Sequence, residues 1–310
     1  MTGSFDSELN LTYWGIGNPG PDWNASQRKG DNLYSDSVVA LDADTGKLNW
    51  HFQFTPNDPY DYDAVQIPLL ADANWDGKMR KLMLWANRNG YFYALDRTDG
   101  KFLSGHPFVK VNWASGLDDK GRPMSTPQPP GTPIYPGVQG GTNWYSPSFS
   151  PRTGLLYIST WENYSAISRK ADPGPWKEYK KYSGVAPRRP IATSSGQANP
   201  TGRPVSPTFR TETEGYGAVR AVDPQTGDKK WDFKMVDYTE SGILTTGSDV
   251  LFSGGREGNF FALDARNGEC LWKTSLGGTV ASGPMTYLVN GRQFVAVAGG
   301  AALYVFGLPE

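Results

Sequence analysis

Cysteine and histidine are nearly absent from this chain of 310 residues, which has one cysteine, Cys270, and two histidines, His51 and His106. A single cysteine cannot form an internal disulfide, and the sequence contains no CxxC or CxxCH motif for zinc, redox exchange or c-type haem. The scarcity of histidine nearly excludes a histidine-based metal site and a Ser-His-Asp catalytic site.

The sequence also has little net charge and no long hydrophobic run. Its most apolar late stretch, FVAVAGGAALYVFGL at 294–308, is too short for a membrane helix and is split by Gly299 and Gly300, so we expect two buried strands there. The opening MTGSFDSELN has neither a basic end nor an apolar run, and no signal peptide is expected in this chain. A net charge of −1 gives no electrostatic footprint for nucleic acid or acidic lipid. We therefore expect no nucleic-acid partner and no membrane span.

Aromatic residues, glycine and proline are abundant. Aromatic residues make up 13% of the chain, and there are 37 glycines and 24 prolines. This mixture favours many short strands joined by turns over long helices. Hydrophobic residues make up 38% of the chain, which is enough for a sizeable core.

Internal repetition is the strongest organising signal. Each copy has an apolar strand, an aspartate, a glycine four residues later and a second strand that usually ends on tryptophan. The copies are VVALDADTGKLNW (38–50), FYALDRTDGKFL (92–103), VRAVDPQTGDKKW (219–231) and FFALDARNGECLW (260–272). The pattern is typical of a β-hairpin, because aspartate bonds nearby backbone and glycine accepts a positive φ.

The spacing of the repeats predicts an all-β fold, a partial β-propeller of about four to five four-stranded (W-type) blades over residues 1–310. The repeat aspartates are 54, 127 and 41 residues apart, and the short intervals approach the roughly 40–50 residues of one blade. The long interval accommodates a degenerate unit at 143–161 and a long inserted loop at 163–213, which we interpret as a covering loop. An ordinary β-sandwich with similar hairpins is the alternative.

The stretch NDPYDYDAVQ at 57–66 places three carboxylates, Asp58, Asp61 and Asp63, within six positions. If this stretch is extended, Asp61 and Asp63 point to one face and repel each other unless a cation lies between them. Carboxylate and amide oxygens suit Ca²⁺ or a similar hard ion. The alternative is an acidic turn exposed to solvent.

Three further stretches carry polar residues at strand ends. TYWGIGNPGPDWN contains Asn18 after two glycines, and an amide oxygen can ligate a hard cation. WANRNGYFYALD carries Arg88 at the start of a strand, and GGTNWYSPSFSP offers Asn143 and Trp144 after a glycine pair. Taken singly, each is better explained as a turn or core feature.

Together and in this order, these motifs resemble the C-terminal half of the quinoprotein alcohol dehydrogenases, whose cofactor is pyrroloquinoline quinone (PQQ). The resemblance extends over nearly the whole chain. It is carried by GNPGPDWN, GDNLYSDSVVALDADTG, TPNDPYDYDAV, NRNGYFYALDRTDG and GGTNWYSPSFSP, together with the repeated hairpins. It implies that the blades belong to an eight-bladed propeller.

The resemblance also implies roles for individual residues. Asn18 and Asp61 correspond to metal-site residues, and Asp61 to the general base. Asp63 stands where the lanthanide-using members have aspartate and the calcium-using ones commonly have alanine, so the metal is Ca²⁺ or a lanthanide ion. Arg88 corresponds to the arginine that bonds the quinone oxygens, and Asn143, with Trp144, to residues near the cofactor. If Asp63 merely faces solvent, the site is a calcium site.

The function implied is oxidation of a primary alcohol to an aldehyde by hydride transfer to PQQ, in the periplasm. Because CxxCH is absent, the resemblance implies a separate electron acceptor such as cytochrome c. A non-catalytic propeller scaffold and a PQQ-dependent sugar dehydrogenase are the alternatives.

The family's glutamate ligand, its vicinal cysteine pair and its stacking tryptophan belong to the N-terminal half and are missing here. We therefore expect a truncated or split enzyme that needs that half as a partner. We also expect exposed apolar blade faces, and a chain that can be inactive in isolation.

Overall fold

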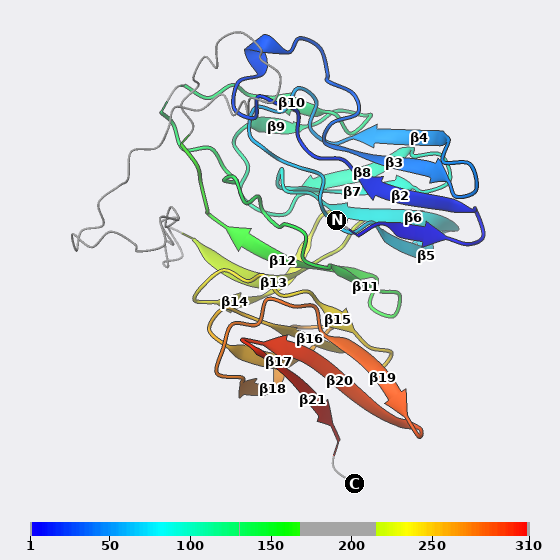
Figure 1. The fold of residues 1–310 in the computed structure, drawn as a ribbon, viewed down its shortest axis with the longest axis vertical. Helices are drawn as coiled ribbons and strands as arrows, with labels where there is room; N and C mark the ends of the chain where they lie inside the picture. The colour runs from blue at the N-terminus through cyan, green and yellow to red at the C-terminus, as the bar shows by residue number, and fades with distance from the viewer. Residues whose placement is uncertain (1, 130, 168–214, 309–310) are drawn as a thin grey trace, which may run out of the picture.

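The structure is a computed structural model that describes residues 2–129, 131–167 and 215–308. The described chain is built almost entirely of strands, with one short 3₁₀ helix, η1 (Ala25–Gln27). The antiparallel sheets follow one another along the molecule from the N-terminal to the C-terminal part of the chain (Figure 1).

Four sheets have the four-stranded form of a propeller blade, with the strands in chain order. The first two are β1 (Ser4–Asp6), β2 (Leu11–Gly15), β3 (Ser37–Asp42) and β4 (Leu48–Gln53), followed by β5 (Leu69–Trp75), β6 (Lys78–Ala86), β7 (Tyr91–Asp96) and β8 (Phe102–Pro107). The other two are β11 (Ser148–Ser150), β12 (Leu155–Glu162), β13 (Tyr216–Val222) and β14 (Lys229–Met235), followed by β15 (Leu244–Thr245), β16 (Val250–Gly254), β17 (Asn259–Asp264) and β18 (Cys270–Ser275).

Two smaller sheets complete the described fold. A three-stranded sheet contains β19 (Met285–Val289), β20 (Arg292–Gly299) and β21 (Ala302–Gly307), and a separate hairpin contains β9 (Ala114–Leu117) and β10 (Pro123–Ser125). The arrangement agrees with the predicted partial propeller of four to five blades. The predicted degenerate unit at 143–161 contains β11 and most of β12.

The four repeats form the predicted hairpins β3–β4, β7–β8, β13–β14 and β17–β18. In each, the carbonyl oxygen of the repeat aspartate accepts a hydrogen bond of 2.8–2.9 Å from the N–H of the glycine four residues later. All four glycines have a positive φ, between 69° and 80°. Local turn chemistry therefore explains the repeat.

Neighbouring blades dock through the tryptophan of one repeat and the glycine of the next. A Cβ on Gly100 would lie 2.5 Å from the Trp50 ring, and the Trp50 Nε1–H donates to the carbonyl oxygen of Arg97 at 3.2 Å. Trp231 repeats this contact, with a Cβ on Gly268 lying 2.6 Å from its ring. The glycine thus provides both the turn and the flat surface that the indole covers.

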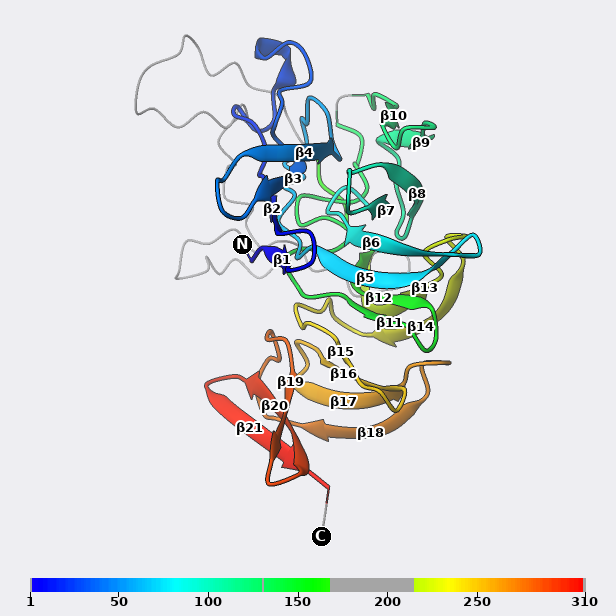
Figure 2. The same cartoon turned by 90° about the vertical axis from the view of Figure 1, so that its right-hand side faces the viewer.

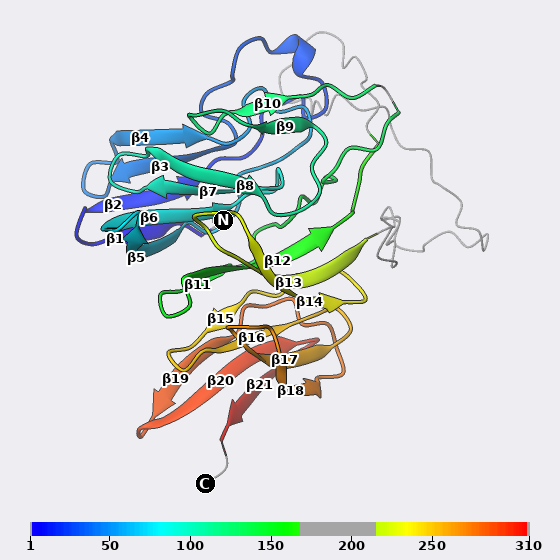
Figure 3. The ribbon, with the colours of Figure 1, turned by 180° about the vertical axis from the view of Figure 1, so that it is seen from behind.

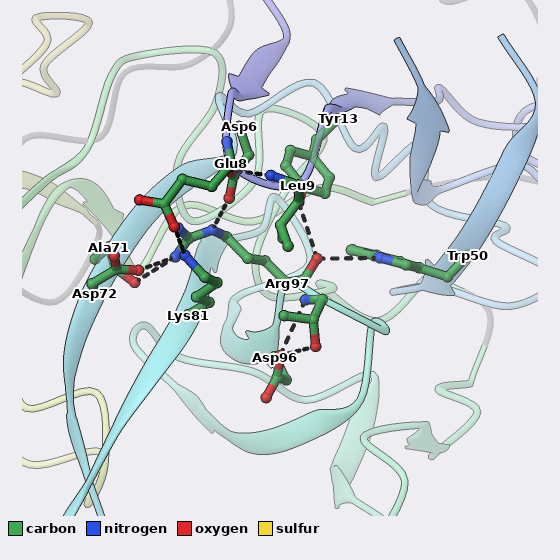
Figure 4. Close-up of polar contacts among 11 residues, drawn as sticks. Asp6, Glu8, Leu9, Tyr13, Trp50, Ala71, Asp72, Lys81, Asp96 and Arg97 are labelled. Carbon is green, nitrogen blue, oxygen red and sulfur yellow. Dashed lines mark hydrogen bonds and ion pairs between the residues drawn. The ribbon is translucent and has the colours of Figure 1, made fainter. Parts of the chain in front are cut away.

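An ion-pair cluster around Arg97 joins the first two blades (Figure 4). The buried Arg97 guanidinium contacts Asp6 of β1 and Asp72 of β5, each at 2.5 Å, and donates to the carbonyl oxygen of Ala71 at 3.0 Å. The Tyr13 hydroxyl donates to the carbonyl oxygen of Arg97 at 3.0 Å. The guanidinium and the carbonyl oxygen of Arg97 therefore link the turn after β7 to β1, β2 and β5.

The connections between strands lie at two opposite ends of the blades. Because the strands of each sheet alternate in direction, the Asp–Gly turns lie at one end of the blades and the segments after β2, β4, β6 and β8 lie at the other. Figures 2 and 3 show the long segment after β2, which carries η1, at the same end of the molecule as the β9–β10 hairpin. β12 and β13 pair directly, and most of the predicted loop at 163–213 between them lies outside the described residues.

The C-terminal sheet differs from one expectation. Of the two buried strands predicted at 294–308, β20 has a buried centre, but β21 is largely exposed. Leu288 is 69% exposed and Leu303 71%, because no further sheet covers them in the described part of the chain. Exposed apolar side chains on a blade face were expected for an open propeller.

None of the described helices is long and apolar enough to cross a membrane.

The docking contact predicts different costs for two equivalent glycines. Gly46→Ala and Gly100→Ala share the backbone strain of a positive φ, about 1–2 kcal/mol, but a Cβ at Gly46 meets nothing within 4 Å. We expect Gly100→Ala to lose about 1–3 kcal/mol more unfolding free energy, because its methyl group overpacks against Trp50. Urea unfolding of both variants measures the difference, and equal losses would contradict the docking role.

Candidate functional site

The Gly-rich end of β2 packs directly against the acidic segment. A Cβ on Gly15 would lie 1.8 Å from the carbonyl oxygen of Ala64, and one on Gly17 would lie 2.6 Å from Asp63 Oδ1. The Ala64 N–H donates to the carbonyl oxygen of Ile16 at 3.3 Å. Only glycine permits this close approach, as the sequence predicted.

The acidic segment is a loop shaped by its first aspartate. The fully buried Asp58 accepts hydrogen bonds from the N–H groups of Tyr60 at 2.7 Å and Tyr62 at 2.6 Å. Asp61 has φ +65°, so this stretch is not extended and the condition under which Asp61 and Asp63 would share a strand face does not hold. The physical reason is that the two hydrogen bonds to Asp58 turn the chain back on itself. One of the three carboxylates is therefore structural.

Asp61 and Asp63 nevertheless converge, because both face Arg88. Asp63 Oδ2 lies 2.5 Å from Arg88 Nη1, and Asp61 Oδ2 lies 3.9 Å from Arg88 Nη2. The guanidinium also donates to the carbonyl oxygen of Val138, and Arg88 is only 6% exposed. The cation that the sequence required near these carboxylates is, in this structure, an arginine.

Asn18 joins the same cluster through its main chain. Its N–H donates to Asp63 Oδ1 at 2.7 Å, while its side-chain Nδ2 is buried without a hydrogen-bond partner among the described residues. The structure thus brings Asn18, Asp61, Asp63 and Arg88 together. Their roles in binding and catalysis stay predictions.

Asp61 has the protonation behaviour of a candidate base. Burial raises its pKa to about 7, with the positive charge of Arg88 lowering the pKa and the negative charge of Asp63 raising it. A base whose pKa lies near the working pH combines a useful ionised fraction with a strong tendency to accept a proton.

The Asn143 segment reaches the cluster from another direction. A Cβ on Gly140 would lie 2.6 Å from the Arg88 Cα, and the Gly141 N–H donates to the Arg88 carbonyl oxygen at 3.0 Å. The Asn143 side chain donates to the carbonyl oxygen of Gln139 at 3.0 Å and accepts from the Trp144 N–H at 2.9 Å. The Asn143 amide therefore stabilises its own loop, whereas Trp144 is 54% exposed.

The sequence reasoning missed Asp36, which precedes β3. Asp36 is fully buried, and neither of its carboxylate oxygens has a hydrogen-bond partner among the described residues. Burial, together with the negative charges of Asp58 and Asp63, raises its pKa to about 9. The one signal available was a charged residue placed directly before the apolar run VVAL.

The donor set fits a hard cation. Asn18, Asp61 and Asp63 offer amide and carboxylate oxygens, the ligands that Ca²⁺ and similar ions prefer. The unpartnered Asn18 Nδ2 is a hydrogen-bond donor, so the fit rests on the amide and carboxylate oxygens and not on this nitrogen. Among the described residues, however, no three His, Cys, Asp or Glu side chains are close enough to form a preorganised metal site.

The chain is similar over nearly its full length to quinone-dependent alcohol dehydrogenases. It is 40% identical to the quinohemoprotein alcohol dehydrogenase of Comamonas testosteroni, covering 96% of this chain and 41% of that protein. It is 37% identical to the quinoprotein alcohol dehydrogenase PedH of Pseudomonas putida, covering 97% and 49%. The chain thus spans less than half the length of these relatives.

Solved structures support the same relationship. The Comamonas testosteroni enzyme superposes with a TM-score of 0.79 over 97% of this chain and 44% of that one, at 37% identity. A europium-containing methanol dehydrogenase superposes with a TM-score of 0.77 over 96% of this chain and 50% of that one, at 32% identity. Residues 1–112 and 112–295 match the family described as "PQQ: Glucose/ethanol/alcohol dehydrogenase, beta-propeller domain". The chain therefore belongs to the PQQ-dependent alcohol dehydrogenase family.

Proposed function

We propose that this chain is the C-terminal portion of a PQQ-dependent dehydrogenase that oxidises a primary alcohol to an aldehyde, with Asp61 as the general base. The observation that carries the proposal is the convergence of Asp61, Asp63 and Arg88 beside Asn18. A non-catalytic propeller scaffold gives no reason for these side chains to meet at one face.

Asp61 would take the hydroxyl proton of the alcohol. Its partly buried carboxyl has a pKa of about 7, which allows it to accept a proton near neutral pH. Arg88 would direct its N–H groups at negative charge developing on a bound quinone. The carbonyl oxygen of Val138 and the carboxylate of Asp63 hold the guanidinium in place.

Asn18, Asp61 and Asp63 would hold the metal ion, and Arg88, Asn143 and Trp144 would line the PQQ site. Bound PQQ would supply the hydride acceptor, and Ca²⁺ or a lanthanide ion the Lewis acid that polarises it. The additional carboxylate at Asp63 favours a lanthanide, because a trivalent ion gains more from each anionic oxygen. Trp144 is 54% exposed, so its ring offers an apolar surface to a ligand.

Further components would complete the enzyme. The relatives are about twice as long as this chain, which supports an N-terminal half that supplies the remaining cofactor contacts. A separate acceptor such as cytochrome c would take the electrons from the reduced quinone, and the periplasm is the proposed location.

Reconstitution tests the proposal directly. The protein, restored to full length with an N-terminal half, is loaded with PQQ and either Ca²⁺ or La³⁺, and reduction of an artificial dye is followed with ethanol, 1-butanol or glucose as substrate. We expect turnover with the alcohols. Turnover with glucose alone would establish the sugar-dehydrogenase alternative, and no turnover with either ion would overturn the proposal.

Replacing the proposed base should lower the rate of the chemical step even when the metal ion is saturating, which offsets the loss of Asp61 as a metal-binding side chain. We expect Asp61→Asn to lower kcat by about 100-fold or more, since general bases contribute about 10²–10⁴-fold, while PQQ binding measured by absorbance is kept. Asp119→Asn, which removes an exposed carboxylate elsewhere, is the matched control and should leave kcat unchanged. A full-rate Asp61→Asn enzyme would rule out Asp61 as the base.

Replacing the additional aspartate should change the metal preference. Asp63→Asn keeps an oxygen that can accept from the Asn18 N–H but removes the negative charge. We expect activity supported by La³⁺ to fall at least about tenfold more than activity supported by Ca²⁺, because the trivalent ion loses more electrostatic energy. Equal losses with the two ions would argue against a lanthanide site.

A further inference from the structure

Asp36 is fixed beside the candidate cation site by its main chain. Its N–H donates to the carbonyl oxygen of Gly17 at 3.1 Å, and its carbonyl oxygen accepts from the Phe54 N–H at 2.8 Å. Gly17 immediately precedes Asn18, whose own N–H contacts Asp63. Asp36 therefore lies directly behind the loop that carries the proposed metal-binding residues.

The side chain of Asp36 has no structural partner to explain its burial. The hydroxyl of the adjacent Ser35 donates to the carbonyl oxygen of Asn32 at 2.8 Å, and both Asp36 oxygens lack partners among the described residues. Asp58 is a direct contrast, since it is equally buried but accepts two main-chain N–H groups. A buried polar group without hydrogen bonds destabilises the fold, so a requirement other than folding is needed to explain it.

The charges facing Asp36 do not neutralise it either. The carboxylates of Asp58 and Asp63 add charge of the same sign, and Arg28 is the one cation among its main electrostatic neighbours. Arg28 directs its Nη groups elsewhere, to Asn32 Oδ1 at 2.7 Å and to the carbonyl oxygens of Pro21 and Asp58.

The cluster would carry an excess of negative charge if every carboxyl were ionised. Asp36, Asp58, Asp61 and Asp63 face only two guanidinium groups, those of Arg28 and Arg88. The raised pKa of Asp36, about 9, keeps its carboxyl neutral near pH 7 when no cation is bound. A cation near Asp63 would favour the anionic form of the buried carboxyl.

We propose that Asp36 is a buried carboxyl beside the cation site that gives up its proton to solvent when a cation binds, and that it thereby raises affinity for a trivalent ion more than for a divalent one without ligating either. The inference rests on the proposed function only in placing the ion at Asn18, Asp61 and Asp63. Asp36 would act through space, because its main chain is bonded to Gly17 and Phe54 while Asp63 is among the charges that face its carboxyl. The attraction between a fixed carboxylate and an ion grows with the ion's charge, which gives the selectivity.

The test measures ion binding without PQQ or alcohol. La³⁺ and Ca²⁺ are titrated into the unaltered protein and into Asp36→Asn, which has the same size but no charge, by isothermal titration calorimetry. We expect the La³⁺ affinity to fall about tenfold or more and the Ca²⁺ affinity to fall by a smaller factor. The unfolding temperature of the metal-free protein should rise, since the unpartnered buried carboxyl is gone. Asp119→Asn controls for the loss of one exposed negative charge.

Several outcomes would overturn the proposal. Unchanged affinity for both ions would leave Asp36 without a role at the site. An equal fold-loss of affinity for both ions, together with a lower unfolding temperature, would show that Asp36 has a structural role. If Asp36→Asn does not fold, the same two quantities are measured on Asp36→Ser and read in the same way. La³⁺ failing to bind the unaltered protein would remove the cation that Asp36 is proposed to favour.

The result is independent of the dehydrogenase assay. If Asp36→Asn weakens La³⁺ binding but the protein oxidises no alcohol, this inference stands and the proposed function is rejected. If the enzyme oxidises alcohols but its ion affinities do not change in Asp36→Asn, the proposed function stands and this inference is rejected.

Discussion

The buried guanidinium of Arg88 is the interaction on which the candidate site depends. It pairs with Asp63 at 2.5 Å, faces Asp61 at 3.9 Å and is only 6% exposed. Removing one partner of a buried ion pair leaves an uncompensated charge and costs about 3–5 kcal/mol. Asp63 also accepts from the Asn18 N–H, so the same charge holds the Gly-rich end of β2. Segments from three different connections are thus linked by one charge network, while Tyr62 and Ala64 anchor the acidic loop in the hydrophobic core.

The propeller architecture makes this meeting possible. The strands of a blade alternate in direction, so the connections that follow β2, β4 and β6 all emerge at one face. The Asp–Gly turns emerge at the other, where Gly100 receives the ring of Trp50 and Gly268 that of Trp231 from the preceding blade. One face therefore carries the repetitive contacts that stabilise the stack of sheets. The opposite face is free to carry long irregular loops with polar side chains.

The parts of the fold and of the candidate site that depend on residues close in sequence could be predicted, and those that depend on distant residues could not. The hairpins were predictable because aspartate and glycine act within four residues of each other. The meeting of Asp61, Asp63 and Arg88 was predictable only through the order of motifs. The conformation of the acidic loop was not, because it depends on Asp58 capturing two main-chain N–H groups and placing Asp61 at φ +65°. The exposure of β21 depends on which sheets pack against it, which no local pattern encodes.

Asp36 shows why a functional residue can leave little trace in sequence. Its surroundings are created by chain segments far apart, since Gly17 and Phe54 bond its main chain while Asp58 and Asp63 face its charge. Stability alone would favour a neutral residue at such a position, because a buried carboxyl without partners opposes folding. The adjacent Asp58 shows that this fold can satisfy a buried carboxylate where structure alone is required. Retaining an unsatisfied one beside Asn18 and Asp63 is therefore better explained by a positive charge that the protein itself does not provide.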